Sequence, residues 1–196
     1  MDEQFQDLFK IRRNRKKIRT GEILIAEPFL AEEDFSRSVI YMVEQNSEGN
    51  IGFMLNKPTR YTISELVTEL EGIEFPVYIG GPVEQNQLYY IHRCPEIKNA
   101  LYITNGIYWG GDFSMLVHML RRKEIMPQYI RFFAGYSGWG IGQLEKELEE
   151  NSWMVGNLTS EQIFTMSANQ LWKSAMNNLG GKHRIWASFP ENPVMN

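Results

Sequence analysis

Apolar and polar positions alternate along the chain in short runs, and this pattern predicts strands separated by turns. Residues 21–29, GEILIAEPF, form the first candidate, which ends at Pro28. Residues 37–45 and 51–56 are apolar runs on either side of the turn NSEGN at 46–50, so they predict a β-hairpin. Further strands are predicted at PVYIGGPV (76–83), QLYYIHR (87–93), ALYITN (100–105), QYIRFFA (128–134) and SWMVGNL (152–158).

Four segments show the longer apolar period of a helix, and each begins at a residue type that caps helices. They are residues 62–70 with Thr62 as N-cap and Glu65 in a capping box, 112–125 with Asp112 as N-cap, 142–150 with a glycine cap, and 160–181 with Ser160 as N-cap. Gly180 or Gly181 would end the last helix. The remaining stretch, KHRIWASFPENPVMN (182–196), contains two prolines and predicts a tail or loop.

Strands interrupted by isolated helices predict an α/β (α+β) fold: a single compact domain with a mixed, largely antiparallel sheet flanked by helices. The hairpin argues against a purely parallel sheet. The chain of 196 residues divides into a basic N-terminal arm (1–19), a folded domain (20–182) and a C-terminal tail (183–196).

Charge is distributed unevenly and limits the classes of partner. The net charge is −4, but residues 1–19 carry +4, so residues 20–196 carry −8. An acidic body is a poor match for nucleic acid, and direct nucleic-acid binding is expected only through the arm, if anywhere. A solvated amphipathic helix that docks on the body is the favoured explanation of the arm. Cys94 is the single cysteine, and the sequence offers no membrane span or secretory signal, so a cytoplasmic protein is expected.

The stretch GYSGWG (135–140) approaches three catalytic or binding motifs without completing any. A phosphate loop requires Lys-Ser or Lys-Thr after its glycines, and a dinucleotide fingerprint requires GxGxxG, whereas this chain has GxGxG. A nucleophile elbow requires GxSxG, but here Trp139, two residues after Ser137, occupies the fifth position of the motif. The stretch is therefore interpreted as a structural corner between a strand and a helix, with Gly135, Gly138, Gly140 and Gly142 supplying positive φ or close approach.

Other constellations of reactive residues are weak. His92 and Cys94 would share one face of a strand, which permits a metal pair or a thiolate but also an ordinary half-buried strand. The turns NKP (56–58) and GGP (80–82) could also place Asn56 and Lys57 beside a ligand. No motif calls for a cofactor or a metal, and none is predicted.

The order and spacing of four blocks resemble the YqgE/AlgH family of small bacterial proteins, which has no established activity. The blocks are the strand LIAEPFL with FxRSVIY (Phe35 to Tyr41), GxxxNKP (Gly52 to Pro58), GGPV (Gly80 to Val83) and GYxGWGxGQLExE at residues 135–147, hereafter the signature block. The resemblance covers residues 21–157 and implies a compact mixed-sheet α/β domain in the cytosol. It also implies that Ser137 is not a nucleophile. One branch bears the name of a transcriptional regulator of exopolysaccharide genes, but this chain has no helix-turn-helix pattern.

Two hypotheses for the function follow. The favoured one is a binding or regulatory protein whose partner is a small ligand or another protein. The alternative is an enzyme of unrecognised type that uses a polar pocket built from Arg37, Asn56, Lys57, Gln143 and Glu147. The candidate pocket as a whole comprises Arg37, Asn56, Lys57, Gly80, Gly81, Tyr136, Trp139, Gln143 and Glu147.

Overall fold

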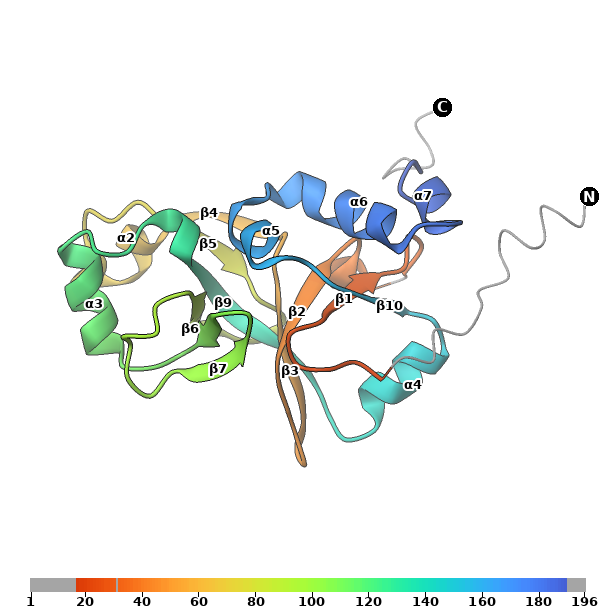
Figure 1. The fold of residues 1–196 in the computed structure, drawn as a ribbon, viewed down its shortest axis with the longest axis horizontal. Coiled ribbons are helices and arrows are strands. Elements are labelled where there is room, and N and C mark those ends of the chain that lie inside the picture. The colour runs from red at the N-terminus through yellow and green to blue at the C-terminus, as the bar shows by residue number, and fades with distance from the viewer. Residues whose placement is uncertain (1–16, 31, 190–196) are drawn as a thin grey trace, which may run out of the picture.

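The computed structural model describes residues 17–30 and 32–189 of the chain (Figure 1). The strands of this part are β1 (Ile23–Ala26), β2 (Val39–Asn46), β3 (Gly49–Met54), β4 (Pro58–Thr62), β5 (Pro76–Ile79), β6 (Val83–His92), β7 (Leu101–Thr104), β8 (Ile107–Trp109), β9 (Ile130–Trp139) and β10 (Trp153–Gly156). Its α-helices are α2 (Ile63–Leu66), α3 (Phe113–Arg121), α4 (Gln143–Glu149), α5 (Ser160–Thr165), α6 (Ala168–Leu179) and α7 (His183–Trp186). The basic arm falls mostly outside the described residues.

All ten strands belong to one sheet, in the order β10-β1-β2-β3-β9-β6-β8-β7, with β5 also beside β9 and β4 beside β5. Every pairing is antiparallel except that of β5 with β9. The predicted hairpin is formed by β2 and β3. The fold class expected from the sequence, a mixed and largely antiparallel sheet in one compact domain, is confirmed.

The long strand β9 joins two halves of the sheet. Residues 132–134 pair with β5, whereas residues 137–139 pair with β3, and β6 runs along the opposite edge. The change of partner takes place at Gly80, whose N–H donates to Ala134 O while its carbonyl accepts from Met54 N. The backbones of three strands therefore meet at Gly80.

Three apolar clusters hold the helices on the sheet. Residues of α5 and α6, together with Trp186 of α7, pack on one side against β1, β2 and β3. The helix α4 buries Leu144 and Leu148 in a second cluster with β1, β2 and β10. The third cluster joins α3 to β5, β6 and the first part of β9. Figure 1 shows α5, α6 and α7 gathered at the top of the molecule and α2 and α3 at its left end.

The signature block is not placed as expected. Residues 135–139 continue β9, so the chain turns towards α4 only after Trp139. Gly135 and Gly142 have positive φ angles of 69° and 74°, whereas Gly138 and Gly140 do not. The strand escaped the sequence analysis because glycines interrupt its apolar pattern, although Ser137 and Gly138 pair regularly with β3.

Other local predictions agree with the structure to varying degrees. The capping box of Thr62 and Glu65 and the N-cap at Asp112 are confirmed. The helix predicted at 160–181 is divided into α5 and α6 around Met166, and its N-cap is Thr159, whose hydroxyl accepts from Gln162 N. Residues 183–189 are not an unattached tail or loop, because Trp186 is 3% exposed in the first cluster.

Candidate functional site

Asn56 and Lys57, the polar candidates after β3, secure the loop that precedes β2. Asn56 accepts from Val39 N through Oδ1 and donates through Nδ2 to Arg37 O, both at 2.8 Å. Lys57 Nζ donates to Ser36 O at 2.8 Å. These bonds hold the turn at Arg37, whose φ is 48° and whose backbone is therefore in a strained left-handed conformation.

The Arg37 side chain faces the helical layer instead of Asn56 and Lys57. Its guanidinium lies 4.7 Å from the Trp172 ring centroid and donates to Phe189 O at 2.9 Å. A cation over an indole face is stabilised by the ring quadrupole. Arg37 thereby attaches the chain after α7 to α6.

Gly80 and Gly81 are required because the backbone of β9 passes against them. A β-carbon at Gly80 would lie 2.1 Å from Gly135 O, and one at Gly81 would lie 2.2 Å from Tyr136 C. Ser137 is fully buried, and its hydroxyl donates to Gly80 O at 3.0 Å. Ser137 therefore stabilises the contact between Gly80 and β9 from within the core.

Glu147 connects the residues of the signature block. Its Oε2 accepts from Trp139 Nε1 at 2.8 Å and from Trp153 Nε1 at 2.7 Å, while Gln143 Nε2 donates to its Oε1 at 2.9 Å. The two indole rings meet edge to face with centroids 6.0 Å apart. One carboxylate thus satisfies two largely buried indole N–H groups and joins β9, α4 and β10.

The nine candidates lie on several elements, and two of them line a common groove. Tyr136 packs edge to face on Tyr89, on the opposite side of β9 from Trp139. Lys57 and Gly81 share a small groove of about 220 Å³ with Glu33, Asp34, Gln85 and the apolar residues Met54, Ile79 and Pro82. None of the other seven candidates lines that groove. The role of the nine residues as a single site stays a prediction.

His92 and Cys94 are both buried and are engaged with the backbone. His92 Nδ1 accepts from Cys94 N at 3.2 Å, so Nε2 carries the proton that is donated to Gly110 O at 3.0 Å. Burial lowers the pKa of His92 and raises the pKa of the Cys94 thiol to about 11, so a neutral imidazole and a protonated thiol are favoured. In residues 17–30 and 32–189 no three His, Cys, Asp or Glu side chains gather in a way that could hold a metal ion.

A groove that the sequence analysis did not single out lies between the segment before β5 and the end of α3. Its volume is about 390 Å³, and we call it the lysine groove. One wall is formed by residues 71–75, the other by Leu120, Arg121, Lys123, Ile125, Met126 and Pro127. The floor is apolar, whereas the four charged residues stand around it.

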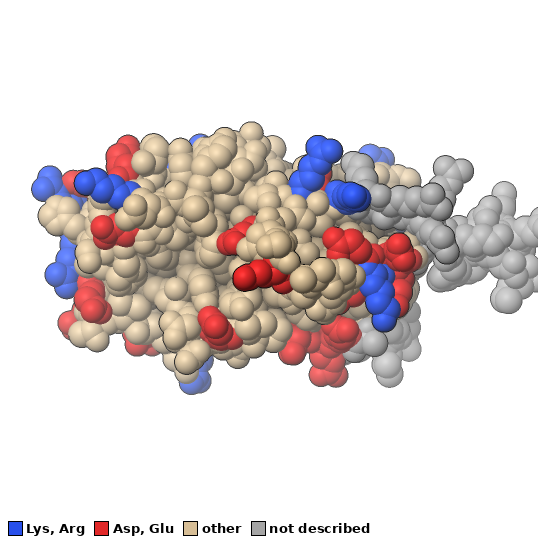
Figure 2. Space-filling model, turned by 90° about the horizontal axis from the view of Figure 1, so that it is seen from below, with Lys and Arg blue, Asp and Glu red and all other residues tan. Residues whose placement is uncertain are grey.

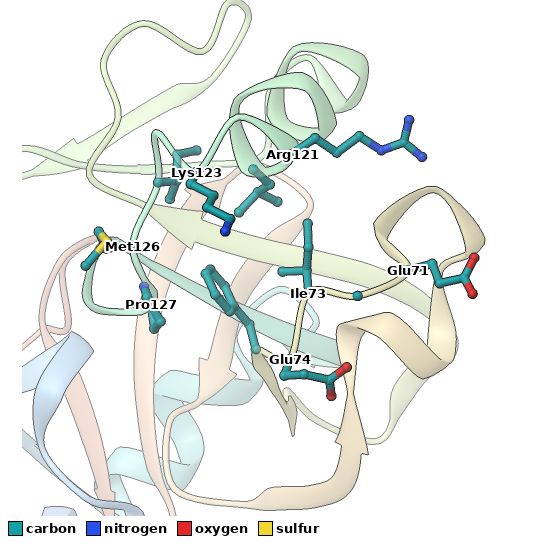
Figure 3. Close-up of a pocket in the computed structure, with 11 residues that line it drawn as sticks. Glu71, Ile73, Glu74, Arg121, Lys123, Met126 and Pro127 are labelled. Atoms are coloured by element: carbon teal, nitrogen blue, oxygen red, sulfur yellow. The ribbon is translucent and has the colours of Figure 1, made fainter.

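Lys123 is the charged group that enters the lysine groove. Figure 3 shows its side chain extending over the floor, while Glu71 and Arg121 point outward. Arg121 Nε is held by Glu69 O at 2.9 Å. Lys123 has a φ of 59°, and its N–H donates to Leu120 O at 2.9 Å, whereas no hydrogen bond or ion pair joins its side chain to another described residue. In the sequence Lys123 is the last residue of RRK (121–123) at the end of a predicted helix. Basic residues at this position commonly offset the helix dipole.

Two further observations concern the molecule outside the grooves. Acidic side chains gather beside α4, at the right of the face in Figure 2, where Glu145, Glu149 and Glu150 are exposed. Across the part of the chain that the structure describes, no helix is both long and apolar enough to cross a membrane.

The sheet order and the internally bonded signature block define a class of mixed-sheet α/β proteins. The chain belongs to the AlgH-like family, whose model matches residues 23–184. It is 42% identical over 181 residues to a UPF0301 protein of Chlorobium limicola, covering 92% of this chain and 97% of the relative. A UPF0301 protein of Bacteroides thetaiotaomicron is 37% identical over 191 residues, covering 97% of each chain.

Two solved structures share the fold. A crystal structure of a Corynebacterium diphtheriae protein matches with a TM-score of 0.75 at 22% identity, covering 89% of this chain and 94% of that one. The solution structure of the AlgH protein from Pseudomonas aeruginosa matches with a TM-score of 0.70 at 23% identity, covering 89% and 98%. At these identities the likeness concerns the fold alone. The family resemblance inferred from the four sequence blocks is confirmed.

Proposed function

We propose that this chain is a cytoplasmic binding or regulatory protein that recognises its ligand through the lysine groove. One observation carries the proposal: the ammonium group of Lys123, which has no partner among the described residues, lies over the apolar floor of a groove of about 390 Å³. Pockets of roughly 300–1,000 Å³ with a few polar groups on apolar walls are typical of small-ligand sites.

The chemistry of the groove favours an apolar molecule that ends in an anion. Ile73, Phe75 and Ile125 would cover its hydrocarbon part, and Lys123 would approach the negative group. Met126, which is 51% exposed, would be covered by the bound molecule and can adapt its shape to it. Glu74 on the opposite wall would disfavour an anion at that end, so the ligand has a preferred direction.

A binding role is favoured over an enzymatic one because the polar candidate residues already make hydrogen bonds within the protein. Asn56, Gln143 and Glu147 are engaged in hydrogen bonds within the protein. Lys57 donates to a backbone carbonyl, and Arg37 does so as well. Side chains that hold the fold in this way are poorly available for proton transfer to a substrate.

Octanoate and its neutral amide test the proposal. In ¹⁵N-resolved NMR titrations, octanoate should shift amide signals of residues 71–75 and 120–127, and octanamide should bind the same place more weakly. Lys123→Gln should abolish the preference for octanoate, whereas Lys146→Gln, a change of an exposed lysine on α4, should preserve it. Shifts that map elsewhere, or no binding of either probe, would refute a ligand site in the lysine groove.

A regulatory role through direct DNA contact receives no support from the charge of the domain. Residues 20–196 carry −8, and the seven cations of the arm at 1–19 form the largest basic segment. Any DNA binding should therefore require the arm and should weaken steeply with salt. A gel-shift assay over a salt series, with and without residues 1–19, tests this, and tight salt-resistant binding by the shortened protein would contradict it.

A further inference from the structure

A second cleft, the β6 cleft, lies where β8 separates from β6, and it shares no lining residue with the lysine groove. β8 pairs with β6 at Ile91 and His92. The last hydrogen bond between these two segments runs from Gly110 N to Tyr90 O at 3.0 Å. Gly110 and Gly111 then have positive φ angles of 66° and 110°, and the chain turns away from the sheet.

The separation is fixed by bonds on both sides of the turn. His92 Nε2 donates to Gly110 O at 3.0 Å, and Tyr90 OH donates to Gly111 O at 2.9 Å. A β-carbon at Gly111 would lie 2.7 Å from Ile97 Cγ2 and 2.9 Å from Lys98 O. The open edge of β6 is therefore a built feature of the fold.

The edge that β8 leaves uncovered presents backbone groups of β6. In an antiparallel sheet, alternate residues direct their N–H and C=O groups to the same neighbour. Because the Tyr90 carbonyl points to β8, the N–H and C=O of Leu88 point to the same side, while β9 lies on the other side. No strand of the described chain pairs with Leu88 there.

The walls of the β6 cleft match an uncharged polypeptide segment. The cleft measures about 470 Å³ and contains no charged residue; it is lined by Leu66, Val67, Asn86, Gln87, Leu88, Tyr89, Tyr90, Trp109, Gly110, Gly111 and Phe113. Asn86 and Gln87 are exposed, and their amides make no hydrogen bond to another described residue. Amides both donate and accept, so they suit the main chain of a partner.

We propose that the β6 cleft receives an extended, uncharged segment of a partner protein, which adds to the edge of β6 in the line that β8 leaves. Main-chain bonds to Leu88 supply the register, and the apolar walls receive alternate side chains of the segment. A charged segment is disfavoured because its charges would be desolvated without a counter-charge in the cleft.

The probe is a capped peptide of alternating valine and threonine, compared with the same peptide carrying N-methyl groups on the donors that would face β6. ¹⁵N-resolved NMR should show shifts at residues 86–90 and 109–113 and slower exchange of the Leu88 amide. N-methylation should weaken binding about tenfold or more, because main-chain hydrogen bonds are lost. Equal binding of both peptides, or shifts outside the cleft, would overturn the proposal.

Two variants at one position separate the backbone bond from side-chain packing. Leu88→Ala and Leu88→Pro both remove the leucine side chain, but only proline removes the N–H that faces the open edge. The proline variant should bind the peptide about tenfold more weakly than the alanine variant, with the spectrum outside the cleft unchanged.

A second pair of variants tests the charge of the wall. Leu66→Asp, which places a charge in the wall, should also weaken binding, and Ile141→Asp at a distant exposed position should not. Equal affinities of Leu66→Asp and Ile141→Asp would overturn the proposal, as would a dimer whose Leu88 amide is protected without peptide.

Discussion

Glu147 and Lys123 are both charged side chains beside apolar groups, but their surroundings differ. Glu147 accepts hydrogen bonds from two indoles and an amide and connects three elements of the fold. The Lys123 side chain is exposed over the floor of the lysine groove and has no hydrogen-bond or ion-pair partner among the described residues. The most distinctive sequence block thus contributes to architecture, whereas the proposed recognition site involves an ordinary segment at a helix end.

This difference makes predictions that can be ordered by their effect on stability. Substitutions of the buried or internally bonded residues of the signature block should lower the free energy of unfolding, because these residues have internal partners. Substitutions in the lysine groove should change binding while the free energy of unfolding stays the same.

Trp139→Ala should have the largest effect. The indole is 5% exposed, packs on Trp153 and donates to Glu147. Its removal should cost about 3–5 kcal/mol from the lost burial and the cavity. Chemical unfolding followed by circular dichroism measures the loss. A variant of wild-type stability that has lost binding of a ligand would instead place Trp139 on a recognition surface.

Two glycines of β9 form a matched pair with the next largest difference. Gly135 has a φ of 69°, and a β-carbon there would lie 2.5 Å from Val83 O, so Gly135→Ala should cost about 2 kcal/mol or more. Gly138 is exposed, and its β-carbon would meet side chains alone, the Tyr136 ring at 2.9 Å and Val83 Cγ2 at 3.9 Å. Gly138→Ala should therefore cost less than about 1 kcal/mol.

The comparison of the two alanine variants should be made by calorimetry under identical conditions. Equal losses would mean that backbone conformation and close approach at Gly135 contribute little. The sequence alone favours the opposite expectation for Gly138, because that glycine precedes a large aromatic in an apparent corner.

His92 is a buried polar residue that lies outside both the signature block and the lysine groove. Its folded-state pKa lies below the ordinary value of 6.5, because burial disfavours the imidazolium. Below pH 6.5 the unfolded chain binds a proton that the folded chain does not, so stability is lost as pH falls through this value. The loss should be about 1.4 kcal/mol per pH unit until the folded pKa is reached.

Urea unfolding between about pH 7.5 and about pH 5.5 measures this slope. His92→Gln can keep an amide donor towards Gly110 O without titrating, so its stability should fall less steeply with pH. Parallel curves for the two proteins would contradict a depressed pKa at His92.

How far the sequence leads is visible at particular residues. The β2–β3 hairpin and the caps at Thr62 and Asp112 follow from local patterns and are predicted by the sequence. The continuation of β9 through glycines is not, because its pairing with β3 is a contact between segments far apart in the sequence.

The candidate site was harder to anticipate than the fold. Asn56 and Glu147 look reactive in the sequence, because their partners, Val39 N and two indoles, lie on other elements. Lys123 looks like an ordinary helix-terminal cation, because nothing local reveals that residues 71–75 stand opposite it. Internal satisfaction and concavity are both properties of tertiary structure.

Ser137→Ala should have a modest effect that separates packing from chemistry. The hydroxyl is fully buried and donates to Gly80 O, a carbonyl that also accepts from Met54 N. Because the carbonyl retains a donor, the loss should be about 0.5–1.5 kcal/mol. Any activity later found should persist in the variant, and a loss of activity by orders of magnitude at nearly unchanged stability would restore Ser137 as a nucleophile.

Lys123→Ala should have the smallest effect on stability and therefore tests the comparison most directly. The side chain makes no hydrogen bond or ion pair with a described residue, so its removal should change the free energy of unfolding by no more than about 0.5 kcal/mol. Alanine and lysine bear similar strain at a φ of 59°, so the backbone does not distort the result. Lys146→Ala removes another exposed lysine, one with a single 3.8 Å contact to Glu150, and serves as the control.

Octanoate affinity should fall for Lys123→Ala alone, while both variants unfold like the wild type in urea. If Lys123→Ala instead lowers stability as much as Ser137→Ala does, Lys123 supports the fold, and the distinction between the signature block and the lysine groove fails.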